Sequence, residues 1–204
     1  MYSTVDSIVV GKYVGDNALA AVGSASPILN LLLVLFVGIS TGASIMVSQY
    51  FGAKDRERLS NTIGNCITLA IASSIIIAVL GVIICRPLLE LLNTPDSIID
   101  WCQDYLNIFF VGIIGFTFYN ILSGLMRGLG DSFSALLYLL IATVLNIGLD
   151  VWFVAGFGMG VPGVALATVL AQGISALFCL LKMMRMKAAF DLTRHTLRPR
   201  KQYV

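Results

Sequence analysis

The sequence predicts an all-α membrane protein with five full transmembrane helices, and three observations support this. First, 58% of the 204 residues are hydrophobic, 12% are charged and the mean hydropathy is +0.91, whereas about 25% of residues are charged in soluble proteins. Second, a hydrocarbon core about 30 Å thick requires about 20 mostly apolar residues per spanning helix, and five segments of the chain meet that requirement. Third, Lys and Arg gather in alternate loops, as in other multi-pass membrane proteins.

A shorter helical segment precedes the five spans. Its apolar run, Ile8 to Val10, is too brief to cross a bilayer and follows Asp6, so we interpret it as the last turns of a helix whose beginning is absent. A signal peptide carries its basic residues ahead of the apolar run, whereas Lys12 follows it here, so we do not interpret it as a targeting sequence. The expected helices, in chain order, are about 1–14, 27–51, 62–85, 105–126, 133–156 and 161–182.

The first three full spans contain no Lys, Arg, Asp or Glu. In the first of them, small residues recur at intervals of four, namely Gly38 and Gly42, and Ser40, Ser44 and Ser48. Such repeats are typical of helices that pack closely in membranes. We therefore expect this span to approach a neighbouring helix closely.

The longest loop, about 86–104, lies between the second and third full spans. Asn93-Thr94-Pro95-Asp96 within it indicates a turn followed by a helix start, with Pro early in the helix and Asp near the positive end of its dipole. We expect a short surface helix here, with Trp101 and Tyr105 at the headgroup level, which amphipathic aromatic residues favour.

The distribution of basic residues predicts the topology. Of the 13 Lys and Arg, only Lys12 and Arg86 fall on one side of the membrane, and the positive-inside rule makes the other side cytoplasmic. We expect a transmembrane domain over 1–184 in the cell (plasma) membrane and a basic cytoplasmic tail over 185–204. The net charge of +2 then reflects topology and does not indicate a nucleic-acid partner, although the tail is basic enough to contact anionic lipid.

Neither the cysteines nor the histidine predicts chemistry. The four cysteines match no metal-site spacing, and Cys85 and Cys102 flank one outward loop without the sequence deciding whether they pair. The single histidine, His195, lies in the tail with no nucleophile or metal-ligand cluster nearby. We therefore expect no enzymatic activity and no cofactor.

The fourth full span carries the most informative residue, Asp150. A carboxylate within a membrane span costs about 2.5 to 3.5 kcal/mol on insertion scales, so it usually faces a cavity, an ion or a partner. Thr143 and Asn146 precede Asp150 at helical spacing and share its face. Thr168 and Gln172, four residues apart in the fifth full span, offer a hydroxyl and an amide, and Asp6 adds a second carboxylate if its helix packs nearby.

This oxygen cluster suits either of two coupling ions. Carboxylates with an amide and a hydroxyl can replace much of the water shell of Na⁺, a hard cation. Two carboxylates close together cannot both ionise cheaply, so the pair would titrate as a unit and can instead carry H⁺. Alternatively, Asp150 is a buried carboxyl group that bonds Asn146 and serves helix association alone.

Several short motifs, in this order, resemble the multidrug and toxic compound extrusion (MATE) family. They are VDSIVVG (5–11), LAAVG (19–23), GAS (42–44), QYFGAKD (49–55), RGLGDS (127–132), LNIGLD (145–150) and GVALAT (163–168). The resemblance covers nearly the whole chain. It implies that Asp6, Asn146, Asp150 and Thr168 occupy the positions that form the cation site of the amino-terminal lobe in the prokaryotic branch.

The resemblance further implies an antiporter that exports amphipathic, often cationic, drugs or metabolites while Na⁺ or H⁺ runs inward by alternating access. Members have two related six-helix lobes, so this chain is expected to be the amino-terminal lobe with its first helix truncated, and 185–204 a tail or the start of the inter-lobe linker. Besides the lipid bilayer and the substrate, the implied partner is a carboxy-terminal lobe or a second chain. The alternatives are a non-transporting remnant or half-size subunit, and a lipid-precursor flippase.

Overall fold

The computed structural model of the protein describes residues 2–186 and Phe190, and the rest of the predicted basic tail, with His195, lies outside the described residues. The described chain is helical and contains no strand. Its helices are α1 (Tyr2–Tyr13), α2 (Asp16–Gly52), α3 (Arg56–Leu91), α4 (Asp96–Val111), α5 (Ile113–Gly128), α6 (Ser132–Val151), a short π-helix (Trp152–Gly156) and α7 (Gly160–Arg185).

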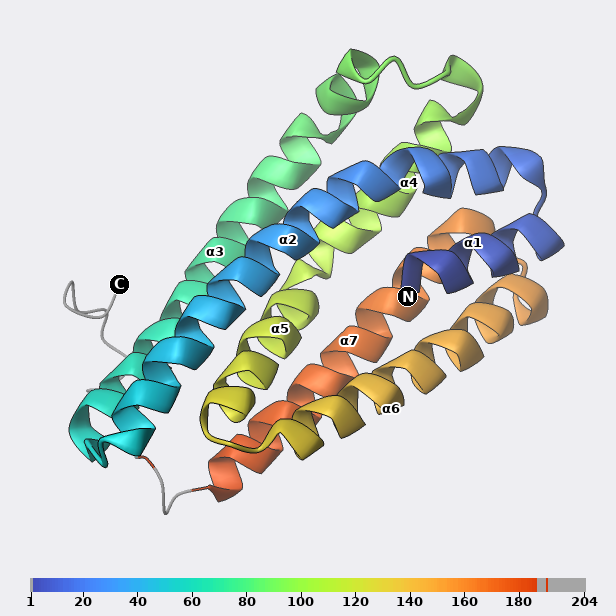
Figure 1. The fold of residues 1–204 in the computed structure, drawn as a ribbon. Coiled ribbons are helices and arrows are strands. Elements are labelled where there is room, and N and C mark those ends of the chain that lie inside the picture. The colour runs from blue at the N-terminus through green and yellow to red at the C-terminus, as the bar shows by residue number, and fades with distance from the viewer. Residues whose placement is uncertain (1, 187–189, 191–204) are drawn as a thin grey trace.

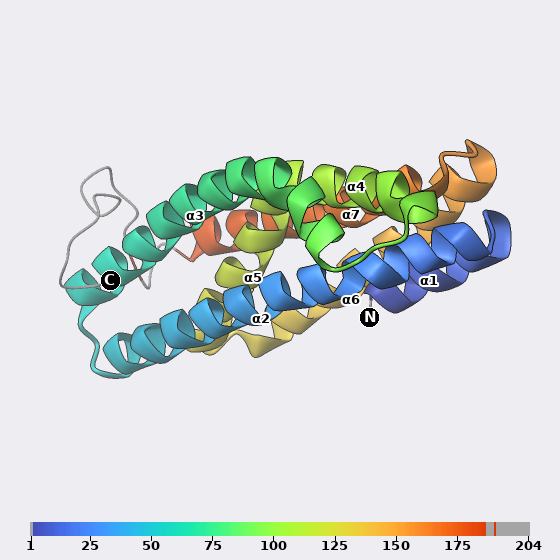
Figure 2. The ribbon, with the colours of Figure 1, turned by 90° about the horizontal axis from the view of Figure 1, so that it is seen from above.

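The helices form a bundle of two layers (Figures 1 and 2). α3, α4 and α7 lie on one side, α1, α2 and α6 lie on the other, and α5 passes between them. Within the described residues, α5 contacts every α-helix except α1, which packs against α2, α6, α7 and the π-helix. The loops at 14–15, 92–95 and 157–159 share one end of the bundle, which we call the acidic end because Asp16, Glu90, Asp96, Asp100 and Asp104 lie there. The opposite end carries the loops at 53–55 and 129–131.

The expected five spans are confirmed when α4 and α5 are counted as one bent span. α2, α3, α7 and α6 with its π-helix are each long and apolar enough to cross a membrane, and α4 and α5 pass the same test together although they meet at an angle of 53°. Gly112 lies at the bend, where a Cβ would stand 2.2 Å from Val169 Cγ1 of α7. Glycine therefore allows the bent span to approach α7.

α2 begins at Asp16, well before the expected start at Pro27, which lies inside the helix. Ala18, Ala21 and Val22 are fully buried ahead of the proline, so packing extends the helix beyond the apolar run from which it was predicted. Pro27 has no N–H to donate to the Gly23 carbonyl, and such a break in a membrane helix is tolerated where neighbouring helices, side chains or water satisfy the freed group.

The expectation of a separate surface helix before the third full span is wrong. α3 continues to Leu91, and after a turn with Asn93 at φ 54° the next helix starts at Asp96 and runs without a break to Val111. The predicted turn and start are therefore correct, but the helix is the first half of the span. Its buried face includes Ile98, Cys102, Tyr105 and Phe109 at helical spacing, and this face draws it into the bundle. Cys85 and Cys102 both remain free thiols.

Of the two predicted small-residue repeats, the serines make the close contact. A Cβ on Gly124 of α5 would lie 2.1 Å from Ser40 Oγ and 2.7 Å from the Ser40 carbonyl oxygen, and one on Gly128 would lie 2.6 Å from the Ser44 carbonyl oxygen. The Ser40 hydroxyl also donates to the Asn120 carbonyl of α5 at 2.6 Å. Gly38, in contrast, has no neighbour within 4 Å of its would-be Cβ.

Asp55 and Asp131 begin the two helices that start near the basic loops. Asp55 accepts a hydrogen bond from the Arg58 backbone N–H at 3.0 Å, and Asp131 accepts one from that of Ser134 at 3.1 Å, as N-caps do. Partial burial raises the pKa of Asp131, but the Ser134 bond and the Lys182 ammonium group, 3.5 Å from the carboxylate, lower it more, so the pKa lies below its usual value.

We predict that Gly124→Ala destabilises the bundle, because the added methyl group meets the Ser40 backbone, which cannot move without shifting α2. Overpacking of this kind costs about 1 to 3 kcal/mol. The matched change Gly38→Ala meets open space and replaces a poor helix former, so it is expected to be neutral or stabilising. Thermal unfolding of both variants in detergent, followed by circular dichroism, measures the difference, and equal melting temperatures would contradict the assigned contact.

Candidate cation site

Four helices bring five polar side chains together inside the bundle. They are Asp6 of α1, Tyr105 of α4, Asn146 and Asp150 of α6, and Thr168 of α7, and each is at most 4% exposed. The structure thus joins all four residues that the sequence predicted and adds a tyrosine. Asn146 and Asp150 are neighbours on α6 because residues four apart share a helix face.

A continuous set of hydrogen bonds links these side chains. The Tyr105 hydroxyl donates to Asp6 Oδ2 at 2.8 Å, and the Thr168 hydroxyl lies 3.4 Å from each Asp6 oxygen. Asn146 Nδ2 donates to Thr168 Oγ1 at 3.0 Å and lies 3.4 Å from Asp150 Oδ1. All five residues therefore belong to one cluster.

Several buried oxygens of this region remain without a donor. Asn146 Oδ1, Asp150 Oδ2 and, one turn along α7 from Thr168, Gln172 Oε1 accept no hydrogen bond from the described residues. A buried polar atom without a partner costs about 1 to 3 kcal/mol, so each such atom requires an explanation. A bound cation supplies one, because it is attracted to oxygen lone pairs that no N–H or O–H reaches.

No basic side chain of the described residues pairs with either of the two carboxyl groups. Within the described chain, ion pairs join Arg58 to Asp55, Arg86 to Glu90 and Asp100, and Lys182 to Asp131, all near the ends of helices. Asp6 and Asp150 are 1% and 0% exposed and take part in none of them. Two buried carboxyl groups without a counterion stay buried at acceptable cost only if protons or metal cations compensate their charge.

Local backbone features position the side chains of the cluster. α6 changes to a π-helix at Trp152, directly after Asp150 and Val151, and Trp152 stacks on Phe153 there with ring centroids 5.6 Å apart. Single π-turns at the end of an α-helix often accompany functional sites. On α4, the bend at Gly112 lets the α4–α5 span lean against α7, and the Tyr105 hydroxyl lies within reach of Asp6 of α1.

Two expectations about individual residues are corrected. Tyr105 was expected at the membrane surface, yet it is 1% exposed and bonded to Asp6. Its place on the apolar face of α4, three residues after Cys102, is the signal that identifies it as buried. Thr143 was grouped with Asn146 and Asp150, but its hydroxyl donates at 2.9 Å to the Leu139 carbonyl of its own helix, a common alternative for Thr within helices.

The ligand types of the cluster restrict the ions that fit it. The described residues contain no group of three or more His, Cys, Asp or Glu arranged to hold a metal ion. Two carboxyl groups, one amide and two hydroxyls form an all-oxygen set of low charge, which matches a hard monovalent cation better than a transition metal. A closely spaced pair of carboxyl groups is also chemically suited to exchange protons.

Comparisons with known proteins identify relatives of the whole described bundle. A family model described as MatE matches residues 1–152. "Probable multidrug resistance protein YpnP" of Bacillus subtilis is 33% identical over 91% of this chain and 42% of its own length. "Probable multidrug resistance protein NorM" of Thermotoga maritima is 28% identical over 86% of the chain and 39% of its own length.

A solved structure described as "MATE in the bent conformation" superposes with a TM-score of 0.93 at 26% identity, covering 99% of this chain and 45% of the other. Another, described as the outward-facing conformation of a multidrug resistance MATE family transporter, gives a TM-score of 0.91 over 99% of this chain and 45% of the other. The chain thus spans less than half the length of these relatives and matches one lobe of their fold.

We predict that Tyr105→Phe weakens the cluster, because it removes the donor nearest to Asp6 and leaves the rest of the ring in place. Losing a hydrogen bond to a buried carboxylate costs about 1 to 3 kcal/mol, which a thermal melt in detergent detects. Tyr138→Phe is the control, since its ring stacks on Phe178 and its hydroxyl donates to none of the described residues. A Tyr105→Phe melting temperature equal to that of Tyr138→Phe would contradict the bond.

Proposed function

The chain belongs to the MatE family, and from that premise we propose that it forms the cation-coupling lobe of an antiporter that exports amphipathic drugs or metabolites. The observation that carries the proposal is the buried pair Asp6 and Asp150, which has no basic partner among the described residues and lies beside donor-free oxygens. Such a pair is expensive in a membrane and is typical of an ion pathway.

Na⁺ is the first candidate for the coupling ion. Asp150 Oδ2 and Asn146 Oδ1 lack donors, so an ion beside them would gain two oxygen ligands without breaking a hydrogen bond. Asp6 and Thr168 lie in the same cluster and are available to complete the shell. Gln172 Oε1, one turn further along α7, is the next donor-free oxygen that an ion could use.

H⁺ is the second candidate, and the two ions compete for one place. A proton held between Asp6 and Asp150 removes the charge that attracts Na⁺, and Na⁺ favours the ionised pair from which the proton has left. Coupled carboxyl groups exchange protons as a pair. We therefore expect Na⁺ binding to weaken as the pH falls.

The ligands come from four helices, and this arrangement couples the ion to the shape of the lobe. Asp6, Tyr105, Asn146 with Asp150, and Thr168 lie on α1, α4, α6 and α7 respectively. An ion that binds one packing of these helices better than another shifts the equilibrium between them. If the substrate's affinity also depends on how these helices pack, ion binding and substrate binding share a coupling free energy, and each changes the affinity for the other.

A second lobe completes the proposed transporter, either in one polypeptide with this lobe or in a second chain. The relatives named above are more than twice as long as the region they share with it, and transporters built from repeated lobes bind substrate between them. The acidic end would face outward, away from the cytoplasm, as the positive-inside rule predicts. The buried polar residues described include no Lys or Arg, which favours a cationic substrate over the anionic precursor that a flippase would carry.

We predict that Asp150→Asn abolishes Na⁺- or H⁺-driven efflux in a transporter that contains both lobes, because the amide keeps the shape of the side chain and removes its charge. Efflux of a fluorescent amphipathic cation from proteoliposomes, driven by an inward Na⁺ or pH gradient, is the measurement. Asp16→Asn is the matched control, since this carboxylate is exposed at the start of α2. Undiminished efflux by Asp150→Asn would refute the proposed role.

We predict that Gln172→Leu separates the two coupling ions. Leucine fills a similar volume without Oε1, so Na⁺ affinity is expected to fall about tenfold, or roughly 1.4 kcal/mol, whereas proton-driven efflux is expected to persist. Gln103→Leu serves as the control, because Gln103 lies near the acidic end and accepts a bond from Arg86 at 3.0 Å. Unchanged Na⁺ affinity would place Gln172 outside the Na⁺ shell.

A further inference from the structure

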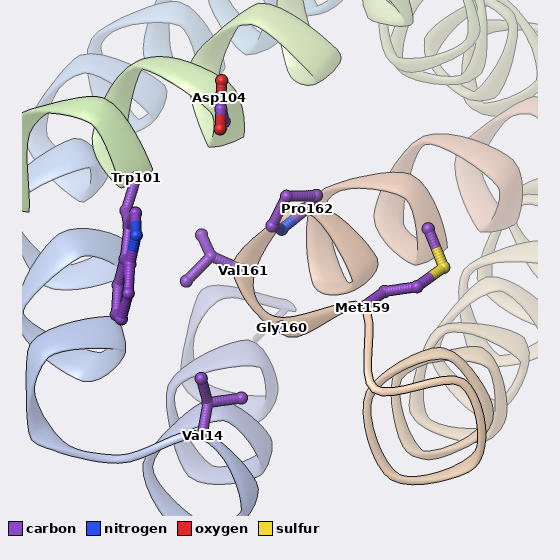
Figure 3. Close-up of a pocket in the computed structure, with 7 residues that line it drawn as sticks. All are labelled: Val14, Trp101, Asp104, Met159, Gly160, Val161 and Pro162. Atoms are coloured by element: carbon purple, nitrogen blue, oxygen red, sulfur yellow. The ribbon is translucent and has the colours of Figure 1, made fainter.

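A pocket lies at the acidic end of the bundle and shares no residue with the buried carboxyl cluster (Figure 3). It has a volume of about 250 Å³ and lies where α1 ends, α4 passes and α7 begins. Its lining consists of Val14, Trp101, Asp104, Met159, Gly160, Val161 and Pro162. The pocket is thus mostly apolar, with one aromatic system and one carboxylate.

The aromatic and the charged group stand on one helix, three residues apart on α4. Figure 3 shows the indole of Trp101 nearly edge-on, with one ring face turned toward Val14 and Val161. Asp104 is exposed and belongs to none of the ion pairs of the described residues. An indole face and a free carboxylate on one pocket are the two features that attract an organic cation.

We propose that this pocket binds the ammonium head group of a small alkylammonium compound, with its methyl groups against the apolar wall and Trp101, and its charge balanced by Asp104. The proposal stands independently of the coupling site, because it uses none of the buried cluster's residues. The volume lies just below the usual 300 to 1,000 Å³ of drug sites, so it suits a head group and not a whole drug molecule.

The lining disfavours other ligands. Na⁺ requires several oxygen ligands, and Asp104 supplies the only carboxylate among the lining residues. An anion finds no Lys or Arg on the wall. The two basic side chains described at this end do not pair with Asp104, since Lys12 Nζ lies 5.4 Å from the centre of the Tyr13 ring and Arg86 binds Asp100 at 2.7 Å. Asp104 is therefore left for a ligand from outside the chain.

The pocket lies further along α1 than the coupling cluster, toward the acidic end. Val14 follows Asp6 by eight residues on α1 and its end, a rise of about 12 Å at 1.5 Å per residue. Tyr105, which bonds Asp6, is the residue next to Asp104. A head group bound here would sit at the acidic end of the bundle, about two turns of α1 from the cluster.

Binding of choline by the full chain in phosphatidylglycerol nanodiscs tests the proposal. The readout is the fluorescence of Trp101 in a Trp152→Phe background, which leaves Trp101 as the sole tryptophan. We expect a saturable change with choline and none with 3,3-dimethyl-1-butanol, its neutral isostere. Asp104→Asn is expected to weaken choline binding about tenfold or more, whereas Asp96→Asn, which removes an exposed carboxylate two turns earlier on the same helix, changes it less than twofold.

An ammonium head group can belong to a lipid or to a soluble compound, and a second experiment distinguishes these two sources. Replacing half of the lipid by phosphatidylcholine is expected to raise the apparent Kd of choline if lipid head groups enter the pocket, and to leave it unchanged if the site takes only soluble compounds. Either outcome is compatible with an ammonium site. Equal responses to choline and its neutral isostere, or equal effects of Asp104→Asn and Asp96→Asn, would overturn the proposal.

Discussion

The structure depends on one electrostatic constraint, the burial of two carboxyl groups inside an apolar helical bundle without a basic partner among the described residues. Asp6 and Asp150 are almost fully enclosed, and charge of this kind is costly in a membrane. The hydrogen bonds from Tyr105 and Thr168 satisfy some of the oxygens of Asp6 but supply no positive charge. In the proposed function, a cation that binds the cluster would remove the remaining cost, so the buried pair would serve ion coupling.

Close backbone contacts make this burial geometrically feasible. Gly112 lets the bent α4–α5 span meet Val169 of α7, and Gly124 brings α5 against Ser40 of α2. Helices in lipid gain little from hydrophobic burial, so contacts between small residues and interhelical hydrogen bonds determine how they associate. The central position of α5 in the bundle (Figure 2) follows from these contacts, and α4, α6 and α7 are thereby placed around α1 to supply ligands.

The sequence was sufficient to predict the membrane fold and the four main cluster residues. Asp150 and Asn146 stand out in an apolar span, and helical spacing alone places them on one face. Tyr105 was misplaced because an aromatic residue near a span end fits both the headgroup region and the core, and only packing distinguishes them. The early start of α2 was missed because small alanines bury well without forming a strongly hydrophobic run. Gly124 and Gly128 make their close contacts with Ser40 and Ser44. These residues are far apart in the sequence, so no local pattern predicts the contacts.

The most direct test of the central claim is a calorimetric titration of the unmodified chain in detergent with Na⁺ at several pH values. If the buried carboxyl pair is a shared site for Na⁺ and H⁺, the titration should show saturable binding near one ion per chain, with an apparent affinity that falls as the pH is lowered and with protons released on binding. The absence of saturable Na⁺ binding at every pH, or binding whose affinity does not change with pH, would contradict the account.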